Sequence, residues 1–321
     1  MTTLLLTHPL CVEHQPPEGH PERPERIKIV DRILSTPSFD PLLREEAPVA
    51  GEAQILSAHA DEHFQRLHQA SPDEGLEQLD PDTWLSPRSF DAALRAAGSA
   101  VRAVDAVMRR EAENAFCAVR PPGHHAESRR AMGFCLFNNA AIAAHHARAA
   151  YDAERVAVVD FDVHHGNGTQ EIFWSDPELF YGSTHQMPLY PGTGDRTERG
   201  VGNIFNAPLR AGDGSQQFRD AMKTLILPAL DDFAPDLLII SAGFDAHRDD
   251  PLASLELTEE DFVWATLYLM DAAHRHADGR VVSLLEGGYD LKALAASVAV
   301  HVQALMRGSG DGGRPLPEDD D

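Results

Sequence analysis

Short apolar runs alternate with longer stretches of mixed polarity along the chain. The apolar runs have the length and aliphatic content of strands that are buried on both faces of a parallel sheet. They cover residues 115–119, 155–159, 236–240 and 281–285. Helix-like runs cover residues 87–111, 136–151, 215–233, 258–276 and 290–307. This alternation predicts a three-layer α/β/α fold with a central, mostly parallel sheet.

Polar side chains follow each apolar run. After residues 155–159 the chain reads Asp160-Phe161-Asp162-Val163-His164-His165. Side chains alternate along a strand, so Asp160, Asp162 and His164 are expected to point to one side. Asp oxygens and His nitrogens together suit Zn²⁺ or another borderline first-row divalent ion. Taken alone, this segment could also be a hydrogen-bonded Asp/His turn without a metal.

The other three apolar runs are also followed by residues that can take part in catalysis or metal binding. His124 and His125 follow two prolines and a glycine, which hold the backbone in the way that positions a general base. Asp245 is a plausible third metal ligand, and Tyr289 follows two glycines and could donate to an oxyanion. Because ligands bind at the carboxyl ends of strands in open α/β sheets, we expect these clusters to form one site.

With these motifs the chain resembles the zinc-dependent histone deacetylase family, including its bacterial amidohydrolase and acetylpolyamine-deacetylase relatives. The motifs lie at residues 120–125, 160–170, 241–247 and 286–289, with further matches at 133–139 and 190–195. The resemblance extends from about residue 3 to about residue 307 and implies an arginase/deacetylase-like fold. Asn167, where the class I branch has Asp, resembles the class II branch.

The resemblance implies roles for the residues of these motifs. It implies one catalytic Zn²⁺ held by Asp162, His164 and Asp245. His124 would be the general base and Tyr289 the oxyanion donor.

For the second histidine, the resemblance implies that His125 is a proton donor or an electrostatic partner of the leaving amine. How the two histidines divide the proton transfers stays open at this point. Asp160 would orient His124, and Asn167 would face His125 as a neutral amide, so we expect different pKa values for the two imidazoles.

Two further groups of residues match the family. The resemblance implies a monovalent cation, K⁺, bound through the backbone of the metal-binding strand, and the matching positions are Asp160, Asp162, His164, Ser183 and Thr184. The substrate-binding residues would be Gly133, Phe134, Tyr190 and Leu252. Leu252 takes the position where polyamine-selecting relatives can carry an acidic residue, which favours acyl-lysine over a cationic polyamine.

Composition and charge limit the partners. The 321 residues carry a formal net charge of −24, which disfavours direct binding to nucleic acid or an anionic membrane and suits basic substrates. The three cysteines, an odd number, do not favour a disulfide framework. With no apolar run of membrane-spanning length and no secretory segment, we expect a cytoplasmic protein.

The chain has no low-complexity linker and no internal repeat, so we expect a single deacetylase domain at residues 1–307 and an acidic, disordered tail at 308–321. The expected function is hydrolysis of N-acetyl-lysine in peptides or proteins, or of related small acyl-amines. The alternatives are an acetylpolyamine deacetylase, a non-catalytic acyl-lysine-binding protein and an arginase-like dimetal hydrolase. The oligomeric state and the choice between zinc and iron stay open.

Overall fold

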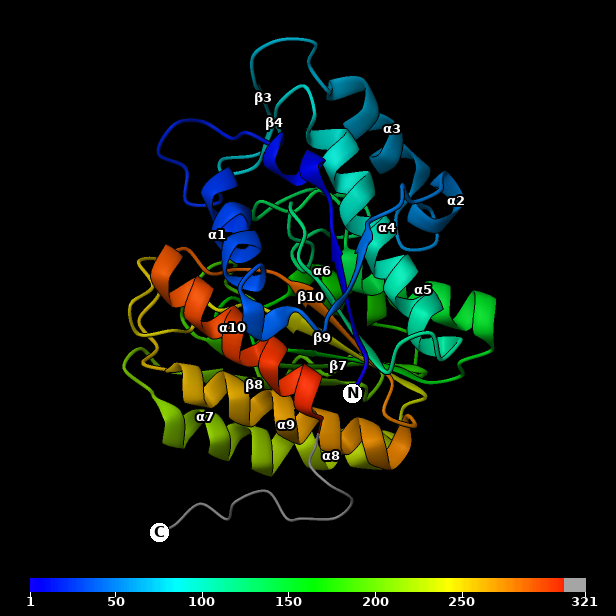
Figure 1. Ribbon diagram of the computed structural model, residues 1–321, viewed down its shortest axis with the longest axis vertical. Coiled ribbons are helices and arrows are strands. Elements are labelled where there is room, and N and C mark those ends of the chain that lie inside the picture. Colours follow the sequence, from blue (N-terminus) through cyan, green and yellow to red (C-terminus); the bar gives the residue numbers. More distant parts are fainter. Residues whose placement is uncertain (309–321) are drawn as a thin grey trace.

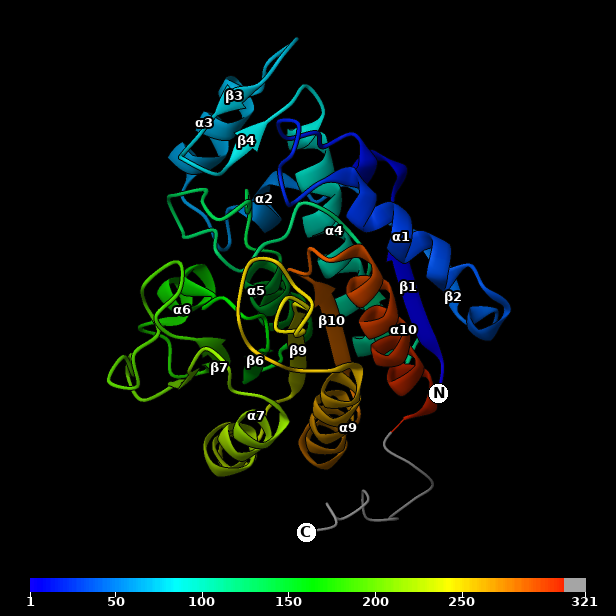
Figure 2. The same cartoon turned by 90° about the vertical axis from the view of Figure 1, so that its left-hand side faces the viewer.

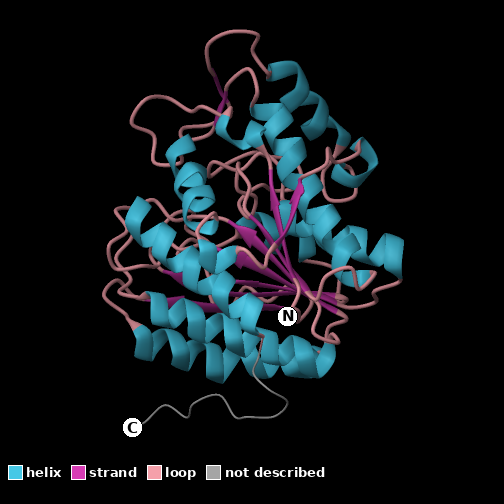
Figure 3. Cartoon of the chain, viewed as in Figure 1, coloured by secondary structure: helices cyan, strands magenta, loops and turns pink. Residues whose placement is uncertain are grey.

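Residues 1–308, which the computed structural model describes, form an eight-stranded sheet with helices on both sides (Figures 1 and 3). The strand order is β2-β1-β5-β10-β9-β6-β7-β8, and all of the pairings in this sheet are parallel. The predicted three-layer α/β/α fold is therefore confirmed. The predicted tail lies outside the described residues, except for Gly308.

The four apolar runs become the four central strands. Each of them is fully buried, as expected for strands covered on both faces. The strands of the sheet are β1 Thr3–Thr7, β2 Leu43–Glu46, β5 Asn114–Cys117, β6 Val156–Asp160, β7 Leu179–Gln186, β8 Ile204–Leu209, β9 Leu237–Ala242 and β10 Val281–Leu285. A separate antiparallel pair consists of β3 Glu77–Gln78 and β4 Trp84–Leu85.

Helices form the outer layers. They are α1 Pro24–Leu34, α2 Glu52–Ile55, α3 Asp61–Ala70, α4 Ser89–Met108, α5 Asn139–Tyr151, α6 Asn167–Phe173, α7 Ser215–Ala221, α8 Leu227–Phe233, α9 Glu259–His276 and α10 Leu291–Arg307. On one side α4 packs against α5, and on the other α10 packs against α1 and α9 (Figure 2). Within residues 1–308 we find no helix long and apolar enough to cross a membrane.

The helix-like run at 215–233 differs from the prediction. The run is interrupted by a π-helical turn, Met222–Ile226, which joins α7 to α8. Such a turn is a single wider turn within a helix, and the pattern of apolar positions alone does not reveal it.

The sheet topology brings the polar motifs together. The strands β5, β10, β9 and β6 are consecutive neighbours, and each is followed by one of the four motifs. Their ends are in register, since Asp160 pairs with Ser241 and Ser241 with Leu284. Motifs that are far apart in the sequence therefore meet at one edge of the sheet.

Candidate metal centre and active site

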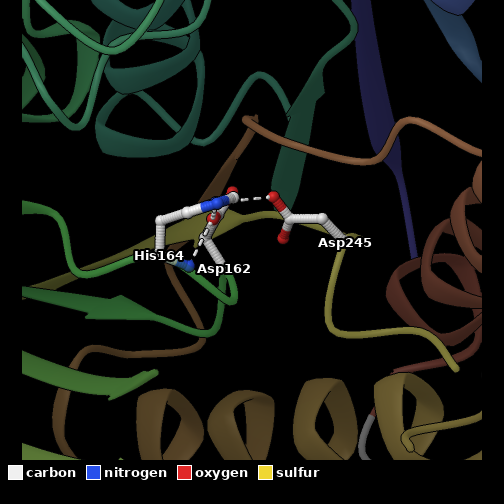
Figure 4. A group of neighbouring side chains, drawn as sticks. All are labelled: Asp162, His164 and Asp245. Atoms are coloured by element: carbon white, nitrogen blue, oxygen red, sulfur yellow. Dashed lines mark hydrogen bonds and ion pairs between the residues drawn. The ribbon is translucent and has the colours of Figure 1, made fainter. Parts of the chain in front are cut away.

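Asp162, His164 and Asp245 form a compact buried group (Figure 4). One potential ligand atom from each residue lies within 4.8 Å of the others. The Nδ1 atom of His164 is 3.1 Å from Asp162 Oδ1 and 3.1 Å from Asp245 Oδ2. Among residues 1–308 this is the group of His, Cys, Asp or Glu side chains whose geometry suits a metal ion.

The backbone reason for this grouping differs from the prediction. Strand β6 ends at Asp160, so strand alternation does not carry Asp162 and His164 to one side. Instead, the backbone N–H of Asp162 donates to Asp160 Oδ1 at 3.1 Å, and that of His164 donates to Asp162 Oδ1 at 2.9 Å. The chain thus leaves the sheet in successive turns that the carboxylates themselves stabilise.

Two glycines leave room for the carboxylates. A Cβ atom at Gly243 would meet the carboxylate of Asp162, and one at Gly287 would meet those of Asp162 and Asp245. The N–H of Gly287 also donates to Asp162 Oδ2 at 2.8 Å. The glycines of the motifs at 241–247 and 286–289 are therefore required by the close approach of backbone to the candidate ligands.

The charges of this group fit a bound cation. Burial and the charge of Asp162 raise the pKa of Asp245 to about 7. No Lys or Arg within residues 1–308 forms an ion pair with either carboxylate. Two buried carboxylates beside an imidazole are costly unless a cation compensates them, and this mixed oxygen and nitrogen donor set suits Zn²⁺.

His124 and His125 lie next to this group, and their ring centroids are 4.0 Å apart. Nδ1 of His124 is 3.0 Å from Asp160 Oδ2, while its Nε2 is 3.9 Å from Asp162 Oδ2. Burial opposes the charged form of His124, but the carboxylates of Asp160 and Asp162 together outweigh burial and raise its pKa well above the usual range.

His125 has the opposite electrostatic surroundings. Its Nδ1 is 2.9 Å from Oδ1 of Asn167, a neutral acceptor. Burial, followed by the charges of His124 and His164, lowers the pKa of His125 well below the usual range. The two imidazoles therefore differ in pKa, in the direction that their partners dictate.

Two carboxylates that support this pair were given no role from the sequence. Glu127 Oε1 accepts from Asn167 Nδ2 at 2.8 Å, which turns the amide oxygen of Asn167 toward His125. Glu286 accepts from the backbone N–H groups of Gly123 at 2.7 Å and His124 at 3.2 Å. Glu286 belongs to the motif at 286–289, so its place in that motif was the available signal.

Tyr289 follows the two glycines after β10 and is 7 % exposed. Its hydroxyl has no hydrogen-bond partner within residues 1–308. Burial and the nearby charge of Asp245 raise its pKa well above the usual range, so the hydroxyl keeps its proton. The guanidinium of Arg26 lies 4.9 Å from the centroid of the tyrosine ring. Tyr289 can therefore act as a hydrogen-bond donor.

Aromatic rings surround the histidine pair and the tyrosine. The ring of Tyr190 is 5.2 Å from that of His125, and the ring of Phe134 is 5.9 Å from that of Tyr289. Gly133 has φ +56°, and a Cβ atom there would meet the ring of His125. Leu252 lies on the loop between β9 and α9 and is half-buried. Gly133, Phe134 and Tyr190 thus lie beside the histidine pair and the tyrosine.

Three of the predicted K⁺ residues, Asp160, Ser183 and Thr184, lie on the neighbouring strands β6 and β7, and Asp162 and His164 follow the end of β6. Ser183 in β7 pairs with Asp160 in β6, and Thr184 follows it. Ser183 is fully buried, and its hydroxyl is 2.9 Å from His185 Nδ1. The structure thus brings Ser183 beside Asp160.

Comparison with known proteins identifies the family. Residues 20–305 match the model of the histone deacetylase domain, so the chain belongs to the histone deacetylase family of hydrolases. It is 38 % identical over 315 residues to a probable deacetylase of Archaeoglobus fulgidus, an alignment that covers 96 % of this chain and 87 % of the relative. It is 41 % identical over 292 residues to a histone deacetylase-like amidohydrolase of Pseudomonas aeruginosa, covering 88 % and 77 %.

A solved structure agrees with this assignment. The crystal structure of the HDA15 HD domain superimposes with a TM-score of 0.90 at 36 % identity, covering 95 % of this chain and 89 % of that one. The arginase/deacetylase-like fold expected from the sequence is therefore confirmed.

Proposed function

We propose that this protein is a zinc-dependent deacetylase that hydrolyses the amide bond of N-acetyl-lysine in peptides or proteins. The observation that carries the proposal is a convergence in one buried site. The three candidate ligands lie within 4.8 Å of one another, next to two imidazoles with different partners and a tyrosine with an unpaired hydroxyl. These are the groups that metal-assisted amide hydrolysis requires.

Asp162, His164 and Asp245 would hold the metal. Bound Zn²⁺ would polarise the amide carbonyl, acidify the attacking water and lower the pKa of His124 beside it. In this proposal the side chains of His124, His125 and Tyr289 carry out the proton transfers and bind the oxyanion.

His124 is the proposed general base. The bond between its Nδ1 and Asp160 fixes the proton on Nδ1, which leaves Nε2 on the side of Asp162. Nε2 can then take a proton from water as the water attacks the amide carbon. A carboxylate partner stabilises the imidazolium that results.

His125 is the proposed partner of the leaving amine. The oriented amide of Asn167 accepts from Nδ1 of His125, so Nε2 is the ring nitrogen left to face the amine. Nε2 of the neutral ring carries no proton of its own, and the proton that His124 takes from the water is the source available for the leaving nitrogen. Tyr289 donates its hydroxyl proton in a hydrogen bond to the oxyanion that forms from the carbonyl. These assignments of the proton transfers to the two histidines are part of the proposal.

An acyl-lysine is the proposed substrate. Phe134 and Tyr190 offer aromatic surface for the lysine methylenes, and Leu252 adds no charge that would select a polyamine. The net charge of −24 favours approach of basic peptides.

We also propose a cytoplasmic location. The three cysteines of the chain are free and buried, which supports this location.

We also propose K⁺ as a structural ion near Asp160 and Ser183. The support is their pairing across β6 and β7 at the end of the metal-binding strand. Replacing K⁺ by Na⁺ in the activity assay tests this proposal, and equal activity in both salts would speak against it.

The decisive experiment is steady-state hydrolysis of an acetyl-lysine peptide and of N-acetylputrescine by the zinc-loaded protein, by Tyr289→Phe and by His124→Ala. We expect turnover of the peptide, with kcat reduced by about 10²-fold or more in each variant. Preferred turnover of N-acetylputrescine would overturn the acyl-lysine assignment. No turnover of either compound by folded, zinc-loaded protein would refute the proposed function.

A further inference from the structure

Asp250 is a buried carboxylate that the chemistry above does not use. It lies in the loop between β9 and α9, five positions after the candidate ligand Asp245, and is 6 % exposed. No Lys, Arg or His within residues 1–308 forms an ion pair with it. A buried carboxylate without a cationic partner needs several hydrogen-bond donors to remain ionised.

Backbone N–H groups from two different loops supply those donors. Asp250 Oδ2 accepts from the N–H of Tyr289 at 2.7 Å and from that of Asp290 at 3.3 Å. Asp250 Oδ1 accepts from the N–H of Leu252 at 3.0 Å. Both oxygens of Asp250 therefore act as hydrogen-bond acceptors for backbone donors.

The hydrogen bond from Tyr289 to Asp250 holds the backbone directly after two glycines. Tyr289 follows Gly287 and Gly288, and Gly288 has φ +124°, a conformation open to glycine. Gly287 is held through its N–H by Asp162, and the carbonyl of Gly288 accepts from Arg26 Nε at 2.6 Å. The peptide N–H of Tyr289 itself is held by Asp250.

The other oxygen of Asp250 binds the backbone of Leu252. Leu252 is the proposed specificity residue, and its N–H binds the same carboxylate as the N–H of Tyr289. A displacement of the turn at 250–252 therefore moves the acceptor on which the backbone position of Tyr289 depends.

We infer that Asp250 is a positioning residue, which fixes the oxyanion donor Tyr289 and couples it to the proposed specificity residue Leu252. This inference rests on the proposed function, since it assigns Tyr289 to the oxyanion. Asparagine in place of Asp250 would keep the shape but offer one acceptor oxygen, so its amide N–H₂ would face a donor in one of the two loops.

The test compares the zinc-loaded full-length protein with Asp250→Ala and Asp250→Asn in hydrolysis of an acetyl-lysine peptide. The matched control is Asp249→Asn, whose side chain is 65 % exposed. We expect kcat of Asp250→Ala to fall by about tenfold or more, with KM changed by less than about threefold. The same substitution in a Tyr289→Phe background should change kcat by less than about twofold, because that background lacks the hydroxyl being positioned.

Asp250→Asn keeps the inference testable if Asp250→Ala does not fold. We expect either a lower kcat or an altered preference between the peptide and N-acetylputrescine, depending on which loop loses its acceptor. An unchanged kcat and preference in Asp250→Asn would overturn the inference. Equal losses of kcat for Asp250→Ala with and without the Tyr289 hydroxyl would also overturn it, because they would indicate a general structural defect.

A second readout does not depend on turnover. The chain has five tyrosines, so a [¹³Cζ]tyrosine NMR spectrum is simple, and Tyr289→Phe identifies the resonance of Tyr289. We expect that resonance to shift or broaden in the Asp250 variants and to stay in place in Asp249→Asn. An unshifted resonance in the Asp250 variants refutes the positioning role even if the wild-type protein proves inactive, which separates this inference from the proposed function.

Discussion

His124 and His125 are neighbours in the sequence with opposite electrostatic surroundings. One imidazole faces the carboxylate of Asp160 and the other the amide of Asn167. The family resemblance predicted that their pKa values differ, because it paired His124 with the carboxylate of Asp160 and His125 with the amide of Asn167. It could not predict that Glu127 orients the amide of Asn167, since the two residues are 40 positions apart and meet only in the folded chain.

Gly133 offers a test at the scale of one residue. A Cβ atom at this position would meet the ring of His125, in addition to the strain of φ +56°. We expect Gly133→Ala to lower kcat by about tenfold or more, because the ring must move away from its position beside the site. Steady-state hydrolysis of the acetyl-lysine peptide measures this effect.

Gly212→Ala is the matched control for that substitution. Gly212 has φ +88° and no atom within 4 Å of an added Cβ, so it has the strain without the clash. It should lose stability by about 1 kcal/mol and keep its kcat. Equal activity of the two variants would contradict the role of Gly133 in packing against His125.

At the scale of elements, the sequence predicted the centre of the sheet better than its edges. β5, β6, β9 and β10 are short, apolar and covered on both faces, so composition alone identifies them. β2 reads Leu-Arg-Glu-Glu and is exposed, as suits an edge strand, and β7 contains buried polar residues. Neither sequence carries an apolar run, so both strands were missed.

The candidate metal ligands show a second limit. The three ligand residues were predicted, but strand alternation was the wrong reason for the proximity of Asp162 and His164. The turns after β6 depend on hydrogen bonds from backbone N–H groups to side-chain carboxylates, including Val163 N to Asp245 Oδ1 at 2.9 Å. That last bond joins residues 82 positions apart, and local patterns cannot predict it.

His301 joins three elements through hydrogen bonds. From α10 its ring reaches Thr266 in α9 at 2.7 Å and Ser283 in β10 at 2.8 Å. Burial lowers its pKa to about 3. Between that value and the unfolded pKa of about 6.5, the unfolded chain binds a proton that the folded chain does not bind. The stability due to neutral His301 is therefore complete above about pH 6.5 and decreases as the pH falls toward 3.

We expect His301→Gln to flatten the dependence of unfolding free energy on pH. The slope between pH 4.5 and 6 should decrease by up to about 1.4 kcal/mol per pH unit, which is the contribution of one proton. Urea unfolding at several pH values measures it. Burial also lowers the pKa of His59 to about 3, so part of the slope persists in the variant. Parallel curves for the two proteins would contradict the prediction.

At the scale of the whole molecule, negative charge dominates. The chain has 51 acidic and 27 basic residues, and two of its carboxylates are buried side by side in the candidate metal centre. A cation that binds the folded state there, and not the unfolded state, stabilises the fold by mass action. Metal binding should therefore be visible in stability as well as in activity.

We expect chelation of the metal to lower the urea midpoint and Zn²⁺ to restore it. At free Zn²⁺ one hundredfold above Kd, the free energy of unfolding should rise by about 2.7 kcal/mol. Asp245→Asn removes a candidate ligand oxygen and should abolish most of this rise, while Asp249→Asn should keep it. An equal rise in Asp245→Asn would place the stabilising ion elsewhere.

The strand order also has a consequence for synthesis on the ribosome. β10 is the last strand of the chain, yet it lies between β5 and β9 in the middle of the sheet. Until residues 281–285 emerge, β2-β1-β5 and β9-β6-β7-β8 are two separate half-sheets, and the inner edges of β5 and β9 are unpaired. A nascent chain stalled before this point therefore exposes two apolar edges, which favour aggregation by pairing with other chains.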